Sequence, residues 1–256
     1  MIAALTGALV APLAGTAAAE TTSYPVKHPK LRANPLYEAG PLPATTCAEP
    51  PVKRHNRKLA RDYVDAVIDC LETTWEQHLT NADLPFRKVK VRHLDRIPKK
   101  YCGYKTDNAD SQAWYCDKTG TLVVQIGKEW LDDPDDLWLF YMTASMYGYH
   151  VQNLVGIAHA YDVAPYGKRA ELLEQARRYS LQSDCFGGAF MKSVWPMEGR
   201  TTKDVNYFRT LPEGDARGEE RWLGKAADIR AWIKRGFATG DPGSCNTWTA
   251  ASAKVA

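Results

Sequence analysis

Six cysteines constrain the fold of this 256-residue chain more than any other feature of its sequence. No two of them form a C-x-x-C pair, which argues against a cysteine zinc site or a redox-active dithiol. An even number of cysteines behind an N-terminal export signal indicates disulfide bonds, since such bonds form and persist outside the cytoplasm. We therefore expect a disulfide-stabilised fold with no thiol left to act as a nucleophile.

Six cysteines allow fifteen connectivities, and the simplest joins nearest neighbours along the chain. These pairs are Cys47 with Cys70, Cys102 with Cys116, and Cys185 with Cys245. The sequence specifies the middle pair, which closes a short loop and would add about 3 kcal/mol of stability. It leaves the connectivity of the other four cysteines open.

The first twenty residues read MIAALTGALVAPLAGTAAAE, a small and apolar run that ends in an A-x-A cleavage pattern before Glu20. The run has no basic start, so the true N-terminus could lie further upstream. It is short and broken by Pro12 and Gly15, which makes it a poor membrane span. We expect residues 1–19 to be a signal peptide and the mature protein to be secreted or extracytoplasmic, without a stable membrane span.

The charges of the chain nearly balance. Thirty-three basic and 30 acidic residues give a net charge of +3, which does not indicate nucleic-acid binding. A local basic run, VKRHNRK, covers residues 52–58. It is read either as the solvated start of a helix or as a contact for an anionic cell-wall polymer.

Hydrophobic patterning predicts an α+β fold that is mainly helical with a small sheet. Residues 20–55 lack a helical or strand period and are expected to be an extended or disordered leader, followed by a single domain over 56–250 and a tail over 251–256. Apolar residues at three- and four-residue steps predict a helix over 58–80. Further helices are expected over 134–160, 167–191 and 219–238. Asp133 is expected to cap the first of these three, with Pro134 at its first helical position. Strands are expected at 87–94 and 120–127.

Three stretches of the second half carry a family resemblance. They read GYHVQNLVG, YSLQSDCFGGAF and IRAWIKRGFATGDPGSCNTW. They resemble the bacterial putative neutral zinc metallopeptidases, in which the first two motifs run H-E-x-G-H-H-V-Q-N and E-L-Q-A-D-C-F-A-G. Retained motif residues include Gly148, His150, Gln152 and Asp184. The resemblance implies a zincin-like fold and, for the family, neutral zinc peptidase activity.

The residues that would carry this chemistry are replaced. By the resemblance, the first zinc histidine falls at Ser145, the general-base glutamate at Met146, the second zinc histidine at Tyr149 and the third-ligand glutamate at Ser180. The histidine of a C-terminal H-G-T motif falls at Leu223. A serine hydroxyl is neither ionised nor basic enough to hold zinc, methionine takes no proton, and one phenol does not make a three-ligand site. We expect no metal, no cofactor and no catalytic residues.

Two retained residues are expected to have structural roles. His150 lies about 100° around a helix from Tyr149, so its side chain should point away from the former metal position and be packed or hydrogen-bonded. Asp184 is expected to form a hydrogen bond between helices.

Three functions are compatible with these features. The first is a secreted, catalytically inactive metallopeptidase-like protein that serves as a binding or scaffold module for a protein or cell-wall ligand. The second is an active hydrolase with a non-standard site around Ser145, Tyr149, His150 and Asp184. The third is a cell-wall-associated structural protein, which the basic run at 52–58 would support.

Overall fold

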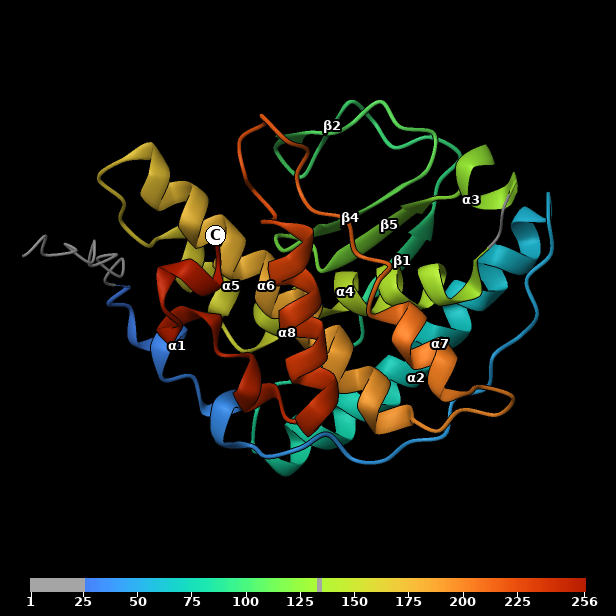
Figure 1. Cartoon of the computed structure of the whole chain (residues 1–256), viewed down its shortest axis with the longest axis horizontal. Coiled ribbons are helices and arrows are strands. Elements are labelled where there is room, and N and C mark those ends of the chain that lie inside the picture. Colours follow the sequence, from blue (N-terminus) through green and yellow to red (C-terminus); the bar gives the residue numbers. More distant parts are fainter. Residues whose placement is uncertain (1–25, 133–134) are drawn as a thin grey trace, which may run out of the picture.

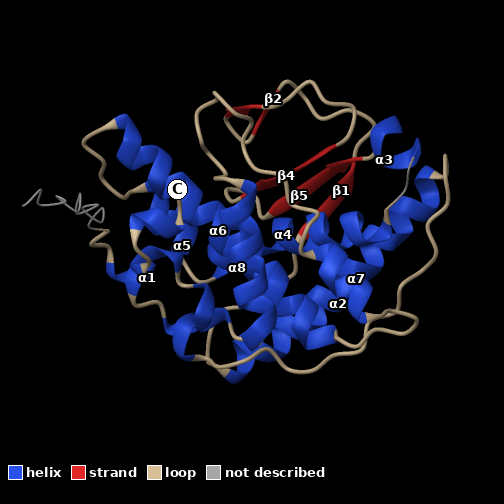
Figure 2. Ribbon diagram, in the orientation of Figure 1, coloured by secondary structure: helices blue, strands red, loops and turns tan. Residues whose placement is uncertain are grey.

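The computed structural model of the chain describes residues 26–132 and 135–256. The predicted signal peptide and the predicted helix start at Asp133 and Pro134 lie outside these residues. The chain is α+β and mainly helical (Figures 1 and 2). The fold class predicted from the sequence is confirmed at this level.

Four long helices form the body of the molecule. They are α2 (Arg57–Asn81), α4 (Asp136–Leu154), α6 (Arg169–Val194) and α8 (Ala226–Thr239). Helix α6 packs between α4 and α8, and α2 packs against the other side of α4 (Figure 1). Most of the buried apolar side chains belong to one continuous core that these helices share.

A small sheet lies along one side of the helices (Figure 2). Its strands are β1 (Lys90–His93), β4 (Gln112–Cys116) and β5 (Thr121–Gln125), in the order β1-β5-β4. Strand β5 is parallel to β1 and antiparallel to β4, and all five of its residues are buried. Strand β4 contacts α4, so the sheet covers the helix that carries the first family motif. A separate hairpin pairs β2 (Lys100–Tyr101) with β3 (Tyr104–Lys105).

The remaining elements are short. They are α1 (Pro29–Arg32), η1 (Pro35–Glu38), α3 (Lys128–Asp132), α5 (Ile157–Asp162), α7 (Thr202–Phe208), η2 (Pro242–Cys245), η3 (Thr247–Thr249) and η4 (Ser252–Lys254).

The predicted helix over 58–80 is confirmed as α2. The side chain of Asn56 accepts a hydrogen bond of 3.1 Å from the Leu59 amide and so caps its start. Asp135 caps the start of α4, where its side chain accepts a hydrogen bond of 3.1 Å from the amide of Trp138. Helix α6 also forms close to its predicted range.

Two predicted helix boundaries are wrong. The helix expected over 134–160 ends at Leu154, because Gly156 adopts a left-handed φ of 78° and a new helix, α5, begins at Ile157. The helix expected over 219–238 begins only at Ala226, after Gly224 with a φ of 109°. The sequence reading also missed α7, which is only seven residues long.

The segment expected to be an extended or disordered leader is largely extended over its described residues and is part of the core. Leu31 and Leu36 are fully buried, and Leu42 nearly so. The side-chain amide of Asn34 donates a 3.1 Å hydrogen bond to the carbonyl of Val155, so this segment also meets the end of α4. The predicted tail also contributes to the hydrophobic core, because Val255 is fully buried.

The cysteines form three pairs at disulfide distance, with Cα separations of 5.4–5.7 Å, and the nearest-neighbour pairing is confirmed. The Cys47–Cys70 bond holds the N-terminal segment on α2, and Cys185–Cys245 holds the C-terminal turn η2 on α6. Among the described helices, none combines the length and apolar character needed to cross a membrane.

Candidate functional site

The family motif positions meet where α4 crosses α6. The two backbones approach closely at Gly148, since a Cβ placed there would lie 2.7 Å from the carbonyl oxygen of Ser183 and 2.9 Å from its Cα. Only glycine fits this distance, which explains physically why this motif position carries one. The close approach brings the side chains before and after Gly148 into contact with α6.

Three residues at four-residue steps line the face of α4 that meets α6. They are Tyr141, Ser145 and Tyr149, and Ser180 and Asp184 lie opposite on α6 with the same spacing. Residues four apart share one face of a helix, so two side-chain rows face each other. Ser145, Ser180 and Asp184 are buried.

Asp184 is the centre of the larger hydrogen-bonded group. Its Oδ1 accepts a hydrogen bond of 2.9 Å from the phenol of Tyr141 and another from the hydroxyl of Ser145. Burial raises the pKa of the Asp184 carboxyl from 3.8 to about 6, although both hydrogen bonds oppose the shift. Asp184 therefore links α6 to α4, as its position in the motif led us to expect.

Tyr149 and Ser180 make the second bridge between the helices. The Tyr149 phenol donates to the Ser180 hydroxyl at 3.1 Å. Burial, with Asp184 nearby, raises the pKa of Tyr149, so this phenol stays neutral at ordinary pH. Its ring packs on Tyr179, with 5.1 Å between the ring centroids, and Tyr179 in turn stacks on Tyr161 at 4.7 Å.

Met146, at the position of the family's general base, is half-buried and packs against the hydrophobic core. A thioether has no proton to exchange with water. Leu223, at the position of the H-G-T histidine, is 44% exposed in the loop before α8. Neither side chain carries a titratable group like the glutamate and the histidine that the family motifs place at these positions.

His150 is fully buried and is held in place from two sides. One ring nitrogen, Nδ1, lies 2.9 Å from the Tyr115 phenol, and Nε2 lies 2.8 Å from the carbonyl oxygen of Arg87. Burial lowers the pKa of His150 to about 4, so the ring is neutral near pH 7. Both nitrogens are occupied by partners in the sheet and the segment before it, and His150 makes no hydrogen bond to Ser145.

The retained glutamines connect distant parts of the chain. The Gln152 side chain donates hydrogen bonds of 2.9 Å to the Tyr179 carbonyl and to the side-chain oxygen of Gln182. That oxygen also accepts a 3.2 Å hydrogen bond from the Trp248 indole. The amide nitrogen of Gln182 donates to the phenol of Tyr37 at 2.9 Å. These motif residues thus hold α4, α6, the N-terminal segment and the C-terminal turns together.

Sequence reasoning missed two residues of the site. Tyr141 was not singled out, although its place four residues before Ser145 on an apolar helix could have revealed it. Tyr115 lies on β4, 35 residues from His150, and also accepts a 2.9 Å hydrogen bond from the Asn153 amide. No local pattern could have identified this long-range partner.

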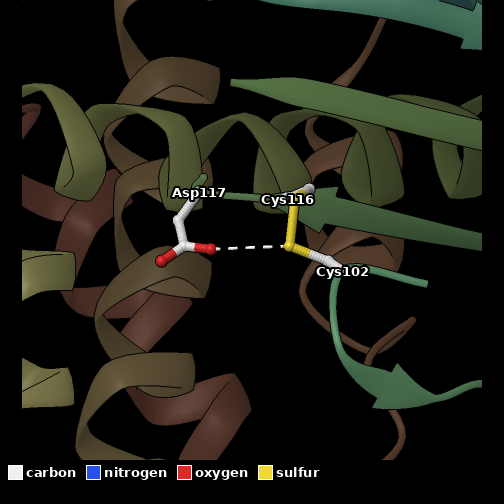
Figure 3. A group of neighbouring side chains, drawn as sticks. All are labelled: Cys102, Cys116 and Asp117. Atoms are coloured by element: carbon white, nitrogen blue, oxygen red, sulfur yellow. Dashed lines mark hydrogen bonds between the residues drawn. A yellow bond between two sulfur atoms is a disulfide. The ribbon is translucent and has the colours of Figure 1, made fainter. Parts of the chain in front are cut away.

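The zinc of the family does not fit the residues at this site. Two serines and a phenol replace its three ligands, and all three are engaged in hydrogen bonds. In the described part of the chain, the only cluster of three or more His, Cys, Asp or Glu with converging ligand atoms is Cys102, Cys116 and Asp117 (Figure 3). Its two sulfurs are joined in a disulfide and therefore are not thiolate ligands.

Comparison with known proteins identifies the class to which this fold and site belong. A family model described as putative neutral zinc metallopeptidase matches residues 40–248, and the chain is a member of this family. The resemblance read from the motifs is thereby confirmed.

Individual relatives agree with this family. The chain is 25% identical to the uncharacterized protein YpfJ of Escherichia coli K12 over 213 residues, which cover 75% of this chain and 73% of YpfJ. It is 30% identical to the uncharacterized protein Rv2575 of Mycobacterium tuberculosis H37Rv over 138 residues, 43% of this chain and 44% of Rv2575. No solved structure matches the chain.

Proposed function

We propose that this metallopeptidase-like protein is catalytically silent and serves as an extracytoplasmic binding or scaffold module with a zincin-like fold. The observation that carries the proposal is the pair of hydrogen-bonded bridges at the former zinc positions. Ser145 bonds to Asp184, and Tyr149 bonds to Ser180. These bonds engage all three side chains at the positions where the family places its zinc ligands.

The retained residues support a scaffold role. Gly148, Gln152, Gln182 and Asp184 all act in packing or in hydrogen bonds between chain segments. Such contacts preserve the shape of the family fold without its chemistry. A partner that recognises this shape, either a protein or a cell-wall ligand, would require no zinc.

The proposed location rests on the cysteines. Three pairs at disulfide distance are typical of proteins outside the cytoplasm. The apolar N-terminal run adds an export signal to this argument. Periplasmic or culture-medium fractions of the source cells should therefore contain the protein, and recovery only from the cytoplasm would contradict this part of the proposal.

The position of the basic run at 52–58 favours its reading as the start of a helix over its reading as a cell-wall contact. Helix α2 begins at Arg57, whose Nε donates a 2.9 Å hydrogen bond to the carbonyl of Ile126. Lys58 pairs with Asp62 at 2.6 Å on the helix surface. At least two of its basic groups thus have partners within the protein.

A peptidase assay tests the proposal. The purified chain, incubated with a peptide library in the presence of zinc, should give no turnover that a chelator removes. Zinc-dependent cleavage would overturn it. The alternative hydrolase predicts cleavage that is lost in both Ser145→Ala and His150→Ala, so these two variants separate a non-standard site from a contaminating protease.

A further inference from the structure

A strongly basic segment that belongs to no family motif covers residues 87–105, from just before β1 to the end of the β2–β3 hairpin. It has eight basic residues and one acidic residue, Asp95, in a chain whose overall charge is only +3. Asp95 is itself paired with Arg61 on α2 at 2.9 Å. This segment therefore concentrates positive charge, and its one acid is engaged by a cation from another element.

The hairpin carries two exposed lysines side by side. Lys100 on β2 lies directly opposite Lys105 on β3. Opposite residues of an antiparallel pair have Cβ atoms about 4.5–5.5 Å apart, and like charges at this distance are destabilising. Among the described residues, the lysines that form ion pairs are Lys58 and Lys88, so neither charge of the hairpin is balanced in this way. An anion bound between the two would offset their repulsion.

The hairpin is fixed in shape before any ligand binds. Its two-residue turn, Cys102 and Gly103, has φ angles of 53° and 91°, the positive values that a type I′ turn has at both positions. The disulfide between Cys102 and Cys116 holds this turn on β4. At the other end, the amide of Thr106 donates a 3.1 Å hydrogen bond to the carbonyl of Lys99. The backbone that carries the lysine pair therefore does not have to be ordered on binding.

Lys90 and Arg92 on β1 are exposed on the same side of the sheet as the hairpin. Val91 between them packs on the hydrophobic core, and side chains alternate along a strand, so both cations point away from the helices. The Tyr101 phenol of the hairpin donates a 3.4 Å hydrogen bond to the carbonyl of Thr121, the β5 residue opposite Lys90. Burial raises the pKa of Tyr101, and the nearby charge of Arg92 opposes this shift. The hairpin, which lies over the sheet in Figure 1, is thus a neighbour of both cations.

Arg87 continues this row of cations beyond the start of β1. Its guanidinium lies over Gly120, where an added Cβ would be 3.5 Å from Nη2. The carbonyl of Gly120 accepts a 2.9 Å hydrogen bond from the amide of Lys90, so Arg87 and Lys90 are neighbours. We call the exposed cations of this row and the hairpin the basic stripe, and its members are Arg87, Lys90, Arg92, Lys100 and Lys105.

The surroundings of the stripe disfavour an acidic peptide that pairs with β1 as an added strand. The amide of Val89, just before β1, donates a 2.9 Å hydrogen bond to the carboxylate of Glu72 on α2. At the end of β1, the ring of His93 lies 2.7 Å from the carboxylate of Asp65 on the same helix. An acidic strand laid along β1 would therefore meet two carboxylates.

The exposed aromatic side chain beside the stripe disfavours single-stranded nucleic acid. Tyr104 is 58% exposed, but it lies on the opposite face of the hairpin from Lys105. Burial raises the pKa of Tyr104, and the charges of Asp162 and Asp117 raise it further. A nucleobase stacked on this ring would bring its phosphate toward two acids instead of toward the lysines.

We propose that the basic stripe binds a linear polymer of phosphodiester groups that carries no bases. One phosphate lies between Lys100 and Lys105, and others lie on Arg92, Lys90 and Arg87. Alternate residues of a strand are about 6.7 Å apart, so Lys90 and Arg92 meet successive charges of an extended chain. The guanidinium groups add bidentate contacts to phosphate oxygens. This ligand class deepens the binding role proposed above and rests on it, but it does not depend on the loss of zinc.

A fluorescence-anisotropy titration of the full chain with a labelled, short poly(glycerol phosphate) tests the site. Binding should saturate and weaken steeply with salt. Each neutralised phosphate of a single-stranded polyanion contributes about 0.7 to the log–log salt slope, so four or five contacts predict a slope of about −3. Free glycerol phosphate offers one contact and should bind at least about a hundredfold more weakly. Binding that does not saturate, or that is insensitive to salt, would overturn the proposal.

A matched pair of double variants locates the binding. Lys100→Gln with Lys105→Gln should weaken binding at least about tenfold and make the salt slope shallower by about 1. Lys203→Gln on α7 with Lys234→Gln on α8 removes the same charge from two other exposed positions and should change the affinity less than about twofold, since distant charges are screened. Equal losses in the two proteins would show that only net charge matters and would overturn the site.

A measurement of stability shows that the first variant is still folded. Removing the charges of Lys100 and Lys105 also removes a repulsion, so this double variant should unfold at the same temperature as the native chain or slightly higher. A lower unfolding temperature would contradict the account of the lysine pair. Lys105→Glu, which converts the repulsion into a cross-strand ion pair, should likewise keep the fold and lose the polymer.

Two competing polyanions test the ligand class. A single-stranded oligonucleotide and poly-L-glutamate, each with the same number of charges as the polymer, should bind at least about threefold more weakly. Tighter binding of either one would overturn the assignment to a phosphate polymer without bases. Catalysis is read separately in the peptidase assay. Absence of both binding and turnover would overturn this inference alone, whereas binding together with zinc-dependent turnover would overturn only the proposed catalytic silence.

Discussion

The phenol of Tyr149 donates a 3.1 Å hydrogen bond to the hydroxyl of Ser180, and this bond joins α4 to α6 at two of the three positions where the family places zinc ligands. At the third position, Ser145 bonds to Asp184. Direct contacts between side chains thus occupy the place of a metal-centred connection between the helices. These two side-chain contacts link the helices without requiring an ion.

The Tyr149–Ser180 contact can be measured with a double-mutant cycle. Tyr149→Phe and Ser180→Ala should each lower the free energy of unfolding by about 0.5–1.5 kcal/mol, since each removes one buried hydrogen bond. The double variant should lose less than the sum of the two, with a coupling energy of about 1 kcal/mol. Urea unfolding of the four proteins measures this, and additive losses would show that the bond contributes nothing.

Asp184 should make stability depend on pH in a specific direction. Its folded-state pKa of about 6 lies above the usual 3.8, so between these values the folded state holds a proton that the unfolded state has released. The contribution of Asp184 to the free energy of unfolding therefore falls as the pH rises through this window. The total fall is about 3 kcal/mol.

Asp184→Asn isolates this effect, since asparagine does not titrate. The free energy of unfolding of the native chain minus that of the variant should decrease from about pH 3.5 to about pH 7. A difference that is constant, or that increases with pH, would show that the carboxyl is not held in its neutral form by burial.

Two glycines at the α4–α6 contact should respond oppositely to alanine. Gly148→Ala forces a Cβ to within 2.7 Å of the Ser183 carbonyl oxygen and should cost about 1–3 kcal/mol of stability. At Gly187 the nearest atom, the Ser145 amide nitrogen, would be 3.4 Å away. Gly187→Ala, which restores the residue of the family motif, should stabilise α6 by up to about 1 kcal/mol. Thermal unfolding of both variants checks the pair, and a loss in Gly187→Ala equal to that in Gly148→Ala would contradict it.

The Cys47–Cys70 bond should stabilise the N-terminal segment. It joins residues 23 apart in sequence, and removing it with Cys47→Ser and Cys70→Ser together should cost about 3 kcal/mol through the added freedom of the unfolded chain. Proteolysis should then cut the segment before α2 first. A variant as stable and as protease-resistant as the native chain would show that the segment is held by its buried leucines alone.

Local patterns predicted the features of this protein that depend on neighbours in sequence. The apolar stripe of α2, the disulfide between Cys102 and Cys116 and the role of Asp184 between helices followed from spacing or from the family motifs. The boundary at Gly156 was missed, because periodicity continues across it while the backbone turns through a left-handed conformation.

Features that depend on distant residues could not be predicted. The N-terminal segment has no helical or strand period, yet its leucines are buried, and Tyr37 reaches the side chain of Gln182. Likewise, Tyr115 on β4 secures His150 on α4. Such contacts arise only when the chain folds, so no pattern within a short window records them.

The zinc content of the purified protein tests the central claim most directly, with a matched variant as control. Ser145→His, Tyr149→His and Ser180→Glu restore the family's three zinc ligands, and Met146→Glu in the same chain restores its general base. After incubation with zinc and dialysis, elemental analysis should find nearly none in the native chain and about one ion per chain in the variant. About one tightly bound zinc ion in the native chain would contradict the proposal that hydrogen bonds replace the metal site.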